Sequence, residues 1–301
     1  MKHVLSVDQF DRTALEELFK SADAMRELVQ QKGGDSRFST RVAANLFYEP
    51  STRTFSSFAT AMYRLGGNVI PITDVKNSSV AKGETLEDTI RMLAGYADVI
   101  VMRHSEVGAG ERAAAVSNDV PIINAGEGTG DHPTQALLDA YTIYRERGTI
   151  DGLTVTMLGD LKYGRCPHSL AKLLNNFDVT LEFVSPEELQ FPIEIQAELT
   201  NTPAISMNLD GVIAETDVLY VTRVQKERIT DQTEYEKIKD AYVVDKQTLA
   251  KMKSDAIIMH PLPRVNEITT DVDSDPRSAY FRQAENGLYI RMALFDMLIN
   301  K

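Results

Sequence analysis

The chain has 301 residues, of which 43% are hydrophobic and 25% are charged, so it has the composition of a globular protein and the length of two ordinary domains. Its formal net charge of −12 argues against nucleic acid as the main partner, because binding to a phosphate backbone needs a basic face. The single cysteine, Cys166, excludes an internal disulfide framework, and no membrane span or signal-peptide segment is visible, so we expect a cytoplasmic protein without a membrane partner.

In the first half of the chain, apolar runs of strand length alternate with stretches of helical periodicity. In chain order they predict a helix over 11–31, strands over 41–48 and 68–72 with a helix between them, a loop over 73–83, a helix over 85–97, a strand over 98–102, a helix over 110–118, a strand over 120–124 and a long helix from His132 to near Gly148. A glycine-rich turn at 126–130 precedes this long helix.

The alternation repeats from residue 153 onward. It predicts strands over 153–158, 179–184, 218–222 and 256–259, a loop over 159–165, helices over 168–177, 231–241 and 246–253, a helix over 186–200 that Pro192 limits, and a closing helix over 286–299. Alternating strands and helices in both halves predict an α/β fold of two domains, each a mostly parallel sheet flanked by helices.

Polar loops follow several predicted strands, at 49–54, 103–104, 160–165, 222–225 and 260–264. Because ligands of such folds bind at the carboxyl ends of the strands, we expect these loops to form the functional site. The loop over 159–165 lacks a Gly-x-Gly-x-x-Gly pattern, which leaves a dinucleotide site with little support. Cysteine and histidine residues are too few and too widely spaced for a structural zinc site.

The first of these loops contains Ser-Thr-Arg-Thr at 51–54, at the start of a predicted helix. Backbone N–H groups and the positive end of the helix dipole meet there, and the hydroxyls and guanidinium add donors that suit a phosphate dianion. In a simpler interpretation, Ser51 only caps the helix and Arg53 is a surface charge, since serine is a common cap. This stretch alone does not separate the two interpretations.

Further runs follow in order: Lys-Gly-Glu-Thr-Leu at 82–86, Val-Met-Arg-His at 101–104, His-Pro-Thr-Gln-Ala-Leu-Leu-Asp at 132–139, Gly-Asp-Leu-Lys-Tyr-Gly-Arg at 159–165, Thr-Arg-Val-Gln-Lys-Glu-Arg at 222–228 and His-Pro-Leu-Pro-Arg at 260–264. Together with Ser-Thr-Arg-Thr, they resemble the catalytic chain of aspartate carbamoyltransferases over nearly the full length. An ornithine enzyme is expected to have His-Cys-Leu-Pro in place of the last run, and this chain does not.

The resemblance implies the carbamoyltransferase fold, with a carbamoyl-phosphate-binding domain over 1–133 plus the C-terminal helix 286–301 and an aspartate-binding domain over 134–285. It also implies transfer of the carbamoyl group of carbamoyl phosphate to the amino group of L-aspartate, which gives N-carbamoyl-L-aspartate and phosphate in de novo pyrimidine biosynthesis. No metal or cofactor is implied, because orientation and electrostatics can carry this reaction.

For carbamoyl phosphate, the resemblance implies three groups of contacts. The phosphate is held by Ser51, Thr52, Arg53 and Thr54. The carbamoyl oxygen, where negative charge grows in the transition state, is polarised by Thr54, Arg103 and His132. The carbamoyl NH₂ group donates to Gln135 and to the backbone carbonyls of Pro261 and Leu262.

For aspartate, the resemblance implies that Arg165, Arg223 and Gln225 bind the two carboxylates, since planar guanidinium forks suit bidentate contact. Lys82 reaches the site from a neighbouring subunit, together with Ser78 or Ser79, between which the length of the loop does not decide. The resemblance thus implies a homotrimer with shared active sites and leaves open whether regulatory chains bind. The residues that it marks as catalytic are Arg53, Thr54, Lys82, Arg103 and His132.

Two alternatives stay open at this point: a carbamoyltransferase for another amino acid, and a non-catalytic anion-binding subunit. Arg223 and Gln225 argue against ornithine as the acceptor, because arginine does not match a cationic side chain. Cys166 departs from the family pattern, in which threonine usually follows this arginine, and it lacks a strong hydroxyl donor beside the expected aspartate site.

Overall fold

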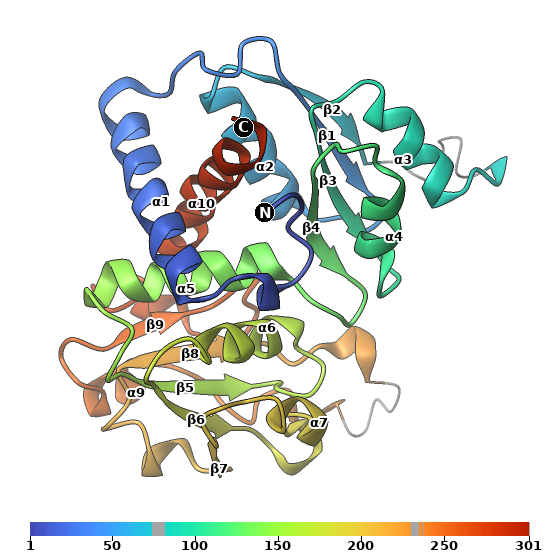
Figure 1. Ribbon diagram of the computed structural model, residues 1–301. Coiled ribbons are helices and arrows are strands. Elements are labelled where there is room, and N and C mark those ends of the chain that lie inside the picture. The colour runs from blue at the N-terminus through green and yellow to red at the C-terminus, as the bar shows by residue number, and fades with distance from the viewer. Residues whose placement is uncertain (74–81, 230–234, 237, 301) are drawn as a thin grey trace. The chain divides into compact units, whose positions relative to one another are not determined.

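The computed structural model describes residues 1–73, 82–229, 235–236 and 238–300 of the chain (Figure 1). The chain forms two compact units, the first made of Met1–Leu138 and Glu285–Lys301 and the second of Asp139–Ala284. Two long helices cross the boundaries between the units, α5 (Pro133–Arg147) and α10 (Tyr280–Ile299). The sequence placed these boundaries at 133/134 and 285/286.

The first unit is built on a parallel sheet with the strand order β2-β1-β3-β4. Its strands are β1 (Val42–Phe47), β2 (Asn68–Ile72), β3 (Val99–His104) and β4 (Ile122–Glu127). The chain passes from β1 to β2 on one side and then returns past β1 to form β3 on the other side. The strand order therefore reverses between β1 and β3, whose carboxyl ends are neighbours because Phe47 pairs with Arg103.

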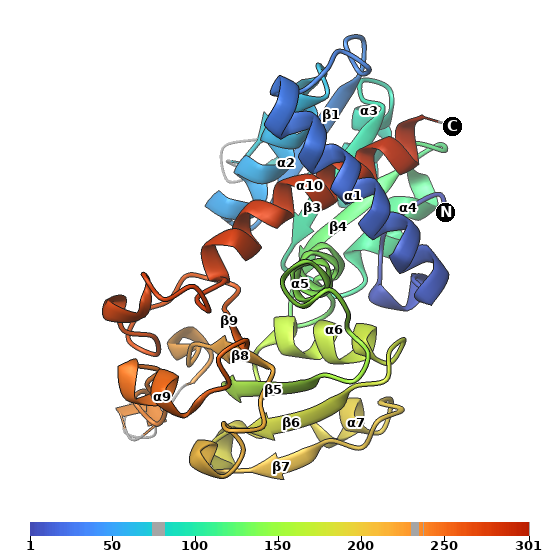
Figure 2. The same ribbon diagram turned by 90° about the vertical axis from the view of Figure 1, so that its left-hand side faces the viewer.

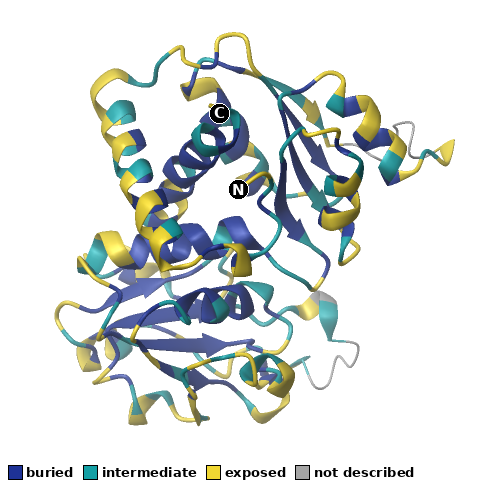
Figure 3. Ribbon diagram, in the orientation of Figure 1, coloured by how far each residue is buried: buried dark blue, intermediate teal, exposed yellow. Residues whose placement is uncertain are grey.

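Helices cover both faces of this first sheet. Figure 1 shows α1 (Arg12–Lys32), α2 (Thr52–Arg64) and α10 on one face and α3 (Leu86–Ala94) and α4 (Ala109–Val116) on the other. Alternate side chains of the strands, among them Ala44, Leu46, Ile100, Met102 and Ile122, pack with Leu86, Ile90, Leu93, Ala109 and Ala113 of α3 and α4. Between α2 and α10, the rings of Phe58 and Phe295 meet edge to face, with centroids 5.7 Å apart. Figure 3 shows the resulting burial of β1, β3 and β4.

The second unit contains another parallel sheet, with the order β7-β6-β5-β8-β9. Its strands are β5 (Thr154–Gly159), β6 (Thr180–Val184), β7 (Ala204–Ser206), β8 (Val218–Thr222) and β9 (Ile257–Met259). Figures 1 and 2 show β5 in the middle of this sheet and β7 at its outer edge. The order reverses between β5 and β8, where Gly159 pairs with Thr222.

The two faces of the second sheet are covered by different helices. On one face, Val184 and Leu219 share a core with Leu249 of α9 (Lys246–Lys251). Phe183 points to the opposite face, because successive side chains of a strand alternate. There it stacks on Phe191, with centroids 4.4 Å apart, and Phe191 meets His168 of α6 (Arg165–Leu174).

The α/β fold of two parallel sheets flanked by helices is confirmed, and a few local expectations are wrong. In place of the helix over 186–200 there are two short pieces, η4 (Glu187–Leu189) and α7 (Ile193–Gln196), because the ring of Pro192 allows a helix to begin but not to continue. The edge strand β7 was not predicted, and α10 begins at Tyr280 instead of residue 286. Further short 3₁₀ helices in the described part of the chain are Val7–Gln9, Leu209–Gly211, Lys226–Arg228 and Thr270–Val272.

Most of the predicted loop over 73–83 and half of the predicted helix over 231–241 lie outside the described residues. Among the helices that the structure does describe, none has both the length and the apolarity needed to cross a membrane.

Candidate active site

Each sheet carries polar loops at the point where its strand order reverses, which is where open α/β sheets bind ligands. In the first unit, β1 leads into residues 49–54 at this point, and β3 ends there with Arg103 and His104. In the second unit, β5 leads into residues 160–165 and β8 into residues 223–225. Most of the residues singled out in the sequence therefore lie at one of two topological switch points.

The start of α2 is suited to an anion. Ser51 occupies the N-cap position with an extended backbone (φ −154°, ψ 94°), yet its side chain makes no cap hydrogen bond, so the hydroxyl does not do the capping that the simpler interpretation assigns to it. Thr52 and Arg53 are exposed and Thr54 is buried. The first turn contains no acidic residue, so nothing within the helix cancels the positive potential of its N-terminus.

Arg103 is held beside this helix start by an ion pair. Its side chain is only 14% exposed, and Nε lies 3.5 Å from Oε2 of Glu49. The backbone carbonyl of Arg103 accepts the N–H of Tyr48 at 2.8 Å, which joins the ends of β1 and β3. The sequence did not predict the pairing of Glu49 with Arg103, which orients a largely covered guanidinium at the switch point.

His132 and Gln135 lie at the start of α5, in the first unit. His132 is buried directly before Pro133, the first residue of the helix, a position that suits proline because no N–H is needed there. The His132 carbonyl accepts the N–H groups of Gln135 at 3.0 Å and Ala136 at 3.2 Å. The first turn of α5 thus fixes the backbone that carries both polar side chains.

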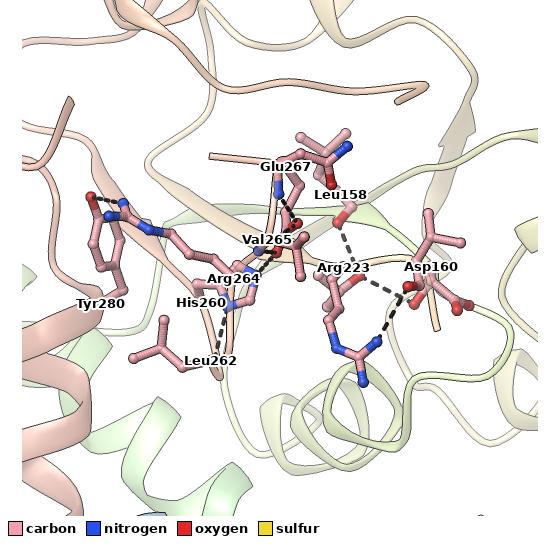
Figure 4. A network of polar contacts seen from close by, with 12 residues as sticks. Leu158, Asp160, Arg223, His260, Leu262, Arg264, Val265, Glu267 and Tyr280 are labelled. Atoms are coloured by element: carbon pink, nitrogen blue, oxygen red, sulfur yellow. Dashed lines mark hydrogen bonds and ion pairs between the residues drawn. The ribbon is translucent and has the colours of Figure 1, made fainter. Parts of the chain in front are cut away.

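Asp160, directly after β5, connects the two switch-point loops of the second unit. Its carboxylate accepts the backbone N–H of Tyr163 at 2.9 Å and that of Gln225 at 3.0 Å. The Thr222 hydroxyl donates to the carbonyls of Leu158 and Asp160, at 3.1 and 3.2 Å (Figure 4). Burial raises the pKa of Asp160, against the hydrogen bonds that favour its ionised form.

The residues expected to bind aspartate lie on these connected loops. Arg165 is the first residue of α6 and is half-buried, as are Arg223 and Gln225. Gly164, the N-cap of α6, lies so close to the preceding loop that a Cβ atom there would be 2.7 Å from the carbonyl oxygen of Asp160. Both loops are therefore packed against the same residue, Asp160.

The loop after β9 has an unusual backbone that His260 and Glu267 support (Figure 4). His260 Nδ1 accepts the N–H of Leu262 at 2.8 Å, so the ring carries its hydrogen on Nε2 and donates it to Glu267 Oε1 at 2.7 Å. Leu262 has a φ of 52°, in the left-handed region that residues with side chains seldom adopt. Burial lowers the pKa of His260. Burial is also the largest single influence on Glu267 and opposes its ionisation, but the hydrogen bond and charge of His260, together with backbone hydrogen bonds, outweigh burial and lower the pKa of Glu267.

Lys82 lies outside these loops, and Cys166 directly follows Arg165 at the end of one of them. Lys82 is exposed and lies just before α3, at the beginning of a described stretch, whereas Ser78 and Ser79 lie outside the described residues. Cys166 is a free, half-buried thiol and the second residue of α6.

Asp160 and Glu267 were not assigned a role from the sequence. The signal for Asp160 was an acidic residue directly after a buried apolar strand, a place where a carboxylate needs hydrogen-bond donors. Its donor Gln225 lies 65 residues further along the chain, so the sequence did not indicate the pairing. Glu267 lies in a polar stretch with no pattern that marks it as buried.

Comparison with known families assigns the two halves of the chain to two domains of one family, and the second match includes most of the C-terminal helix. The carbamoyl-P binding domain of the aspartate/ornithine carbamoyltransferases matches residues 2–145, and the Asp/Orn binding domain of that family matches residues 151–298. The chain belongs to the aspartate/ornithine carbamoyltransferase family.

Relatives in this carbamoyltransferase family are similar over the whole chain. The aspartate carbamoyltransferase catalytic subunit of Thermoplasma acidophilum is 50% identical over 300 residues, which cover 99% of this chain and 98% of the relative. The multifunctional protein pyr1-3 of Dictyostelium discoideum is 53% identical over 301 residues, and there the match covers 99% of this chain but only 13% of the relative.

Solved carbamoyltransferase structures are also similar over nearly the whole chain. The catalytic subunit of M. jannaschii aspartate transcarbamoylase has a TM-score of 0.94 at 48% identity and covers 100% of this chain and 98% of its own. Aspartate transcarbamoylase from Trypanosoma cruzi, in complex with carbamoyl aspartate and phosphate, has a TM-score of 0.89 at 43% identity and covers 97% of this chain and 94% of its own.

Proposed function

We propose that this chain is an aspartate carbamoyltransferase, which forms N-carbamoyl-L-aspartate and phosphate from carbamoyl phosphate and L-aspartate in pyrimidine biosynthesis. The observation that carries the proposal is the placement of basic and hydroxyl side chains at both topological switch points of a carbamoyltransferase. Carbamoyl phosphate, a mixed anhydride, and the dicarboxylate aspartate are both anions, so the enzyme needs a group of hydrogen-bond donors for each, and the side chains at the two switch points suit these roles.

The phosphate of carbamoyl phosphate binds at the start of α2. The hydroxyls of Ser51, Thr52 and Thr54 and the guanidinium of Arg53 join the free N–H groups of the first turn. The absence of a cap hydrogen bond from Ser51 leaves its hydroxyl able to donate to the phosphate. The carboxylate of Glu49 offsets the charge of Arg103 beside this site and keeps its guanidinium in place.

The carbamoyl group is polarised by Thr54, Arg103 and His132, which donate to its oxygen as negative charge develops there. Gln135 and the carbonyls of Pro261 and Leu262 accept from its NH₂ group. Arg165, Arg223 and Gln225 bind the carboxylates of aspartate, with Lys82 supplied by a neighbouring subunit of a homotrimer. Orientation of the neutral amine toward the carbamoyl carbon then supplies much of the rate.

The reaction needs no protein nucleophile. The aspartate amine forms a bond to the carbamoyl carbon, the tetrahedral intermediate collapses, and the bond to the phosphate oxygen breaks. The amine proton leaves with the phosphate, which is basic enough to accept it. The chain therefore acts mainly through its positively charged hydrogen-bond donors.

We further propose that the enzyme works in the cytoplasm, where both substrates are available.

A colorimetric assay of carbamoylated product tests the proposal on the purified chain, with carbamoyl phosphate and either aspartate, ornithine or N-acetylornithine. We expect product with aspartate alone. Product with another acceptor and none with aspartate would support a carbamoyltransferase of different specificity. Binding of carbamoyl phosphate without any turnover would instead support a non-catalytic anion-binding subunit, and a mass measurement of the assembly tests the trimer.

A further inference from the structure

A path of buried hydrogen bonds in the second unit leads to the loop over 260–264. Tyr220 Oη donates to Asp139 Oδ2 at 2.7 Å, and Gln283 Nε2 donates to Asp139 Oδ1 at 2.7 Å. Gln283 Oε1 in turn accepts the backbone N–H of His260 at 2.8 Å. Because these residues belong to β8, α5 and α10, the path ties the loop to three separate elements.

Burial makes the orientation of each group in this path definite. Asp139 and Tyr220 are 0% exposed, and Gln283 is 1% exposed. A backbone N–H only donates, so the oxygen of Gln283 must face His260 and its NH₂ group must face Asp139. Burial raises the pKa of Tyr220 well above its ordinary value, so its hydroxyl remains a donor to Asp139. Asp139 and Tyr220 thereby fix the side-chain amide of Gln283.

The path continues from His260 to the peptide of Leu262. His260 Nδ1 accepts the Leu262 N–H at 2.8 Å, so a displacement of His260 moves this peptide and the carbonyls on either side of it. The positive φ of Leu262, 52°, costs free energy in a residue with a side chain and persists only where neighbouring groups hold it. Gln283 holds the backbone N–H of His260 at the beginning of this loop.

We propose that Gln283, oriented by Asp139 and Tyr220, is a positioning residue for the backbone carbonyls of Pro261 and Leu262 and thereby sets the selectivity of the site for the NH₂ group of its substrate. This inference rests on the proposed function, in which these carbonyls accept from carbamoyl phosphate. A carbonyl oxygen accepts a hydrogen bond from NH₂ and none from CH₃. The placement of these two oxygens therefore separates carbamoyl phosphate from acetyl phosphate, which has nearly the same shape and charge.

The test is calorimetric binding of carbamoyl phosphate, acetyl phosphate and inorganic phosphate to the wild type and to Gln283→Met. We expect the variant to bind carbamoyl phosphate roughly ten-fold more weakly, the effect of losing buried hydrogen bonds, while the affinities for acetyl phosphate and inorganic phosphate stay within about two-fold. Unchanged selectivity between carbamoyl and acetyl phosphate in this variant would overturn the inference.

Thr156→Val is the matched control for lost stability. Thr156 is also completely buried in the second sheet, and its hydroxyl lies 2.7 Å from that of Thr216 and 3.2 Å from a carboxylate oxygen of Glu182, neither of which belongs to the path. We expect this variant to keep the wild-type selectivity, and an equal loss of selectivity in both variants would overturn the positioning role. If Gln283→Met does not fold, Tyr220→Phe replaces it, because it removes one donor and almost no volume; a smaller loss of the same selectivity supports the inference, and no loss overturns it.

A charge exchange between two residues tests the path itself. In the double variant Asp139→Asn with Gln283→Glu, the amide at 139 can donate to the carboxylate at 283, whose other oxygen accepts from His260. The amide oxygen at 139 accepts from Tyr220, so charge and hydrogen-bond number are preserved. We expect the double variant to regain the selectivity and kcat that each single change lowers, and a double variant no better than either single one would overturn the inference. A wild type that forms no carbamoyl aspartate would overturn the proposed function instead.

Discussion

Among single residues, Arg53 carries a charge that the fold places at a helix start without an acidic neighbour in the first turn. We predict that Arg53→Ala lowers kcat by roughly 10²–10³-fold, the size expected for losing one preorganised donor to a developing negative charge, while the melting temperature changes little because the side chain is exposed. Arg91→Ala is the control, since Arg91 is an exposed arginine of α3 whose ion pair among the described residues is local, with Asp88 at 2.9 Å. Near wild-type turnover in folded Arg53→Ala would refute the role of Arg53.

His260 gives the second residue-scale prediction, which concerns pH. Burial lowers the pKa of His260 below 6.5 against the opposing influence of Glu267, while the positive charges of Arg223 and Arg264 lower it further. Because the pKa in the folded state lies below that of the unfolded chain, the stability that neutral His260 contributes is complete above pH 6.5 and is lost as the pH falls through the folded-state pKa. Protonation removes the Nδ1 acceptor of Leu262.

Urea unfolding of the wild type and of His260→Asn, between about pH 8 and about pH 5, measures this contribution. An asparagine oxygen can accept from the N–H two residues further on and does not titrate. We expect the free energy of unfolding of the wild type to fall more steeply toward low pH than that of the variant. Parallel curves for the two proteins would show that His260 does not titrate on unfolding.

At the scale of an element, the start of α6 depends on a close backbone approach. A Cβ at position 164 would lie 2.7 Å from the carbonyl oxygen of Asp160, and the backbone there cannot yield without moving Arg165. We predict that Gly164→Ala costs roughly 1–3 kcal/mol of stability, as overpacking does, and raises the KM for aspartate more than it lowers kcat. Gly211→Ala is the control for both measurements, because no described residue other than its chain neighbours comes within 4 Å of the added methyl group. Equal kinetics of the two variants would contradict the prediction.

Most helices and strands could be predicted from the sequence, and the exceptions are short or depend on distant contacts. Long apolar runs such as β1 and β8, and helices with clear apolar stripes such as α1, were found within a few residues, because burial imposes its period on the sequence. The strand β7 could not be predicted, because Ala204 and Ile205 are exposed at the sheet edge and the strand has only three residues. The first turn of α10 could not be predicted either. The start of this helix is fixed by a contact between residues distant in sequence, in which the N–H of Ala279 donates to the carbonyl of Ile258.

The candidate site could also be predicted only in part. Loops at strand ends could be predicted from the alternation of elements, and the family resemblance supplied roles for Arg53, Arg165 and Arg223. The residues that hold those loops could not be predicted, because their partners are far away in the sequence: Asp160 meets Gln225, and Asp139 meets Gln283 across 144 residues. Such pairs become visible only once the strands are ordered in the sheet.

At the scale of the whole molecule, the chain is acidic, with a formal net charge of −12, while both proposed substrates are anions. The overall field therefore opposes substrate approach, and the attraction has to come from arginines gathered at the two switch points. Lys82 adds a further cation to this set in the proposed homotrimer, from the neighbouring subunit. Because each proposed site needs Lys82 of a neighbouring subunit, only the assembled homotrimer is expected to catalyse the reaction.

Mixing two inactive variants tests this shared site. We predict that Lys82→Ala and Arg53→Ala chains are each nearly inactive, and that subunit exchange between them restores activity, because some sites of a mixed ring combine an intact Arg53 with an intact neighbouring Lys82. For a closed ring with random one-to-one exchange, about one site in four contains neither change, so the recovered activity should approach roughly a quarter of the wild-type value. A chain that carries both changes, mixed with either single variant, is the control and should restore nothing, since every site then keeps at least one change. Confirmed exchange without recovery, or full activity from a demonstrated monomer, would exclude the sharing of Lys82 between subunits.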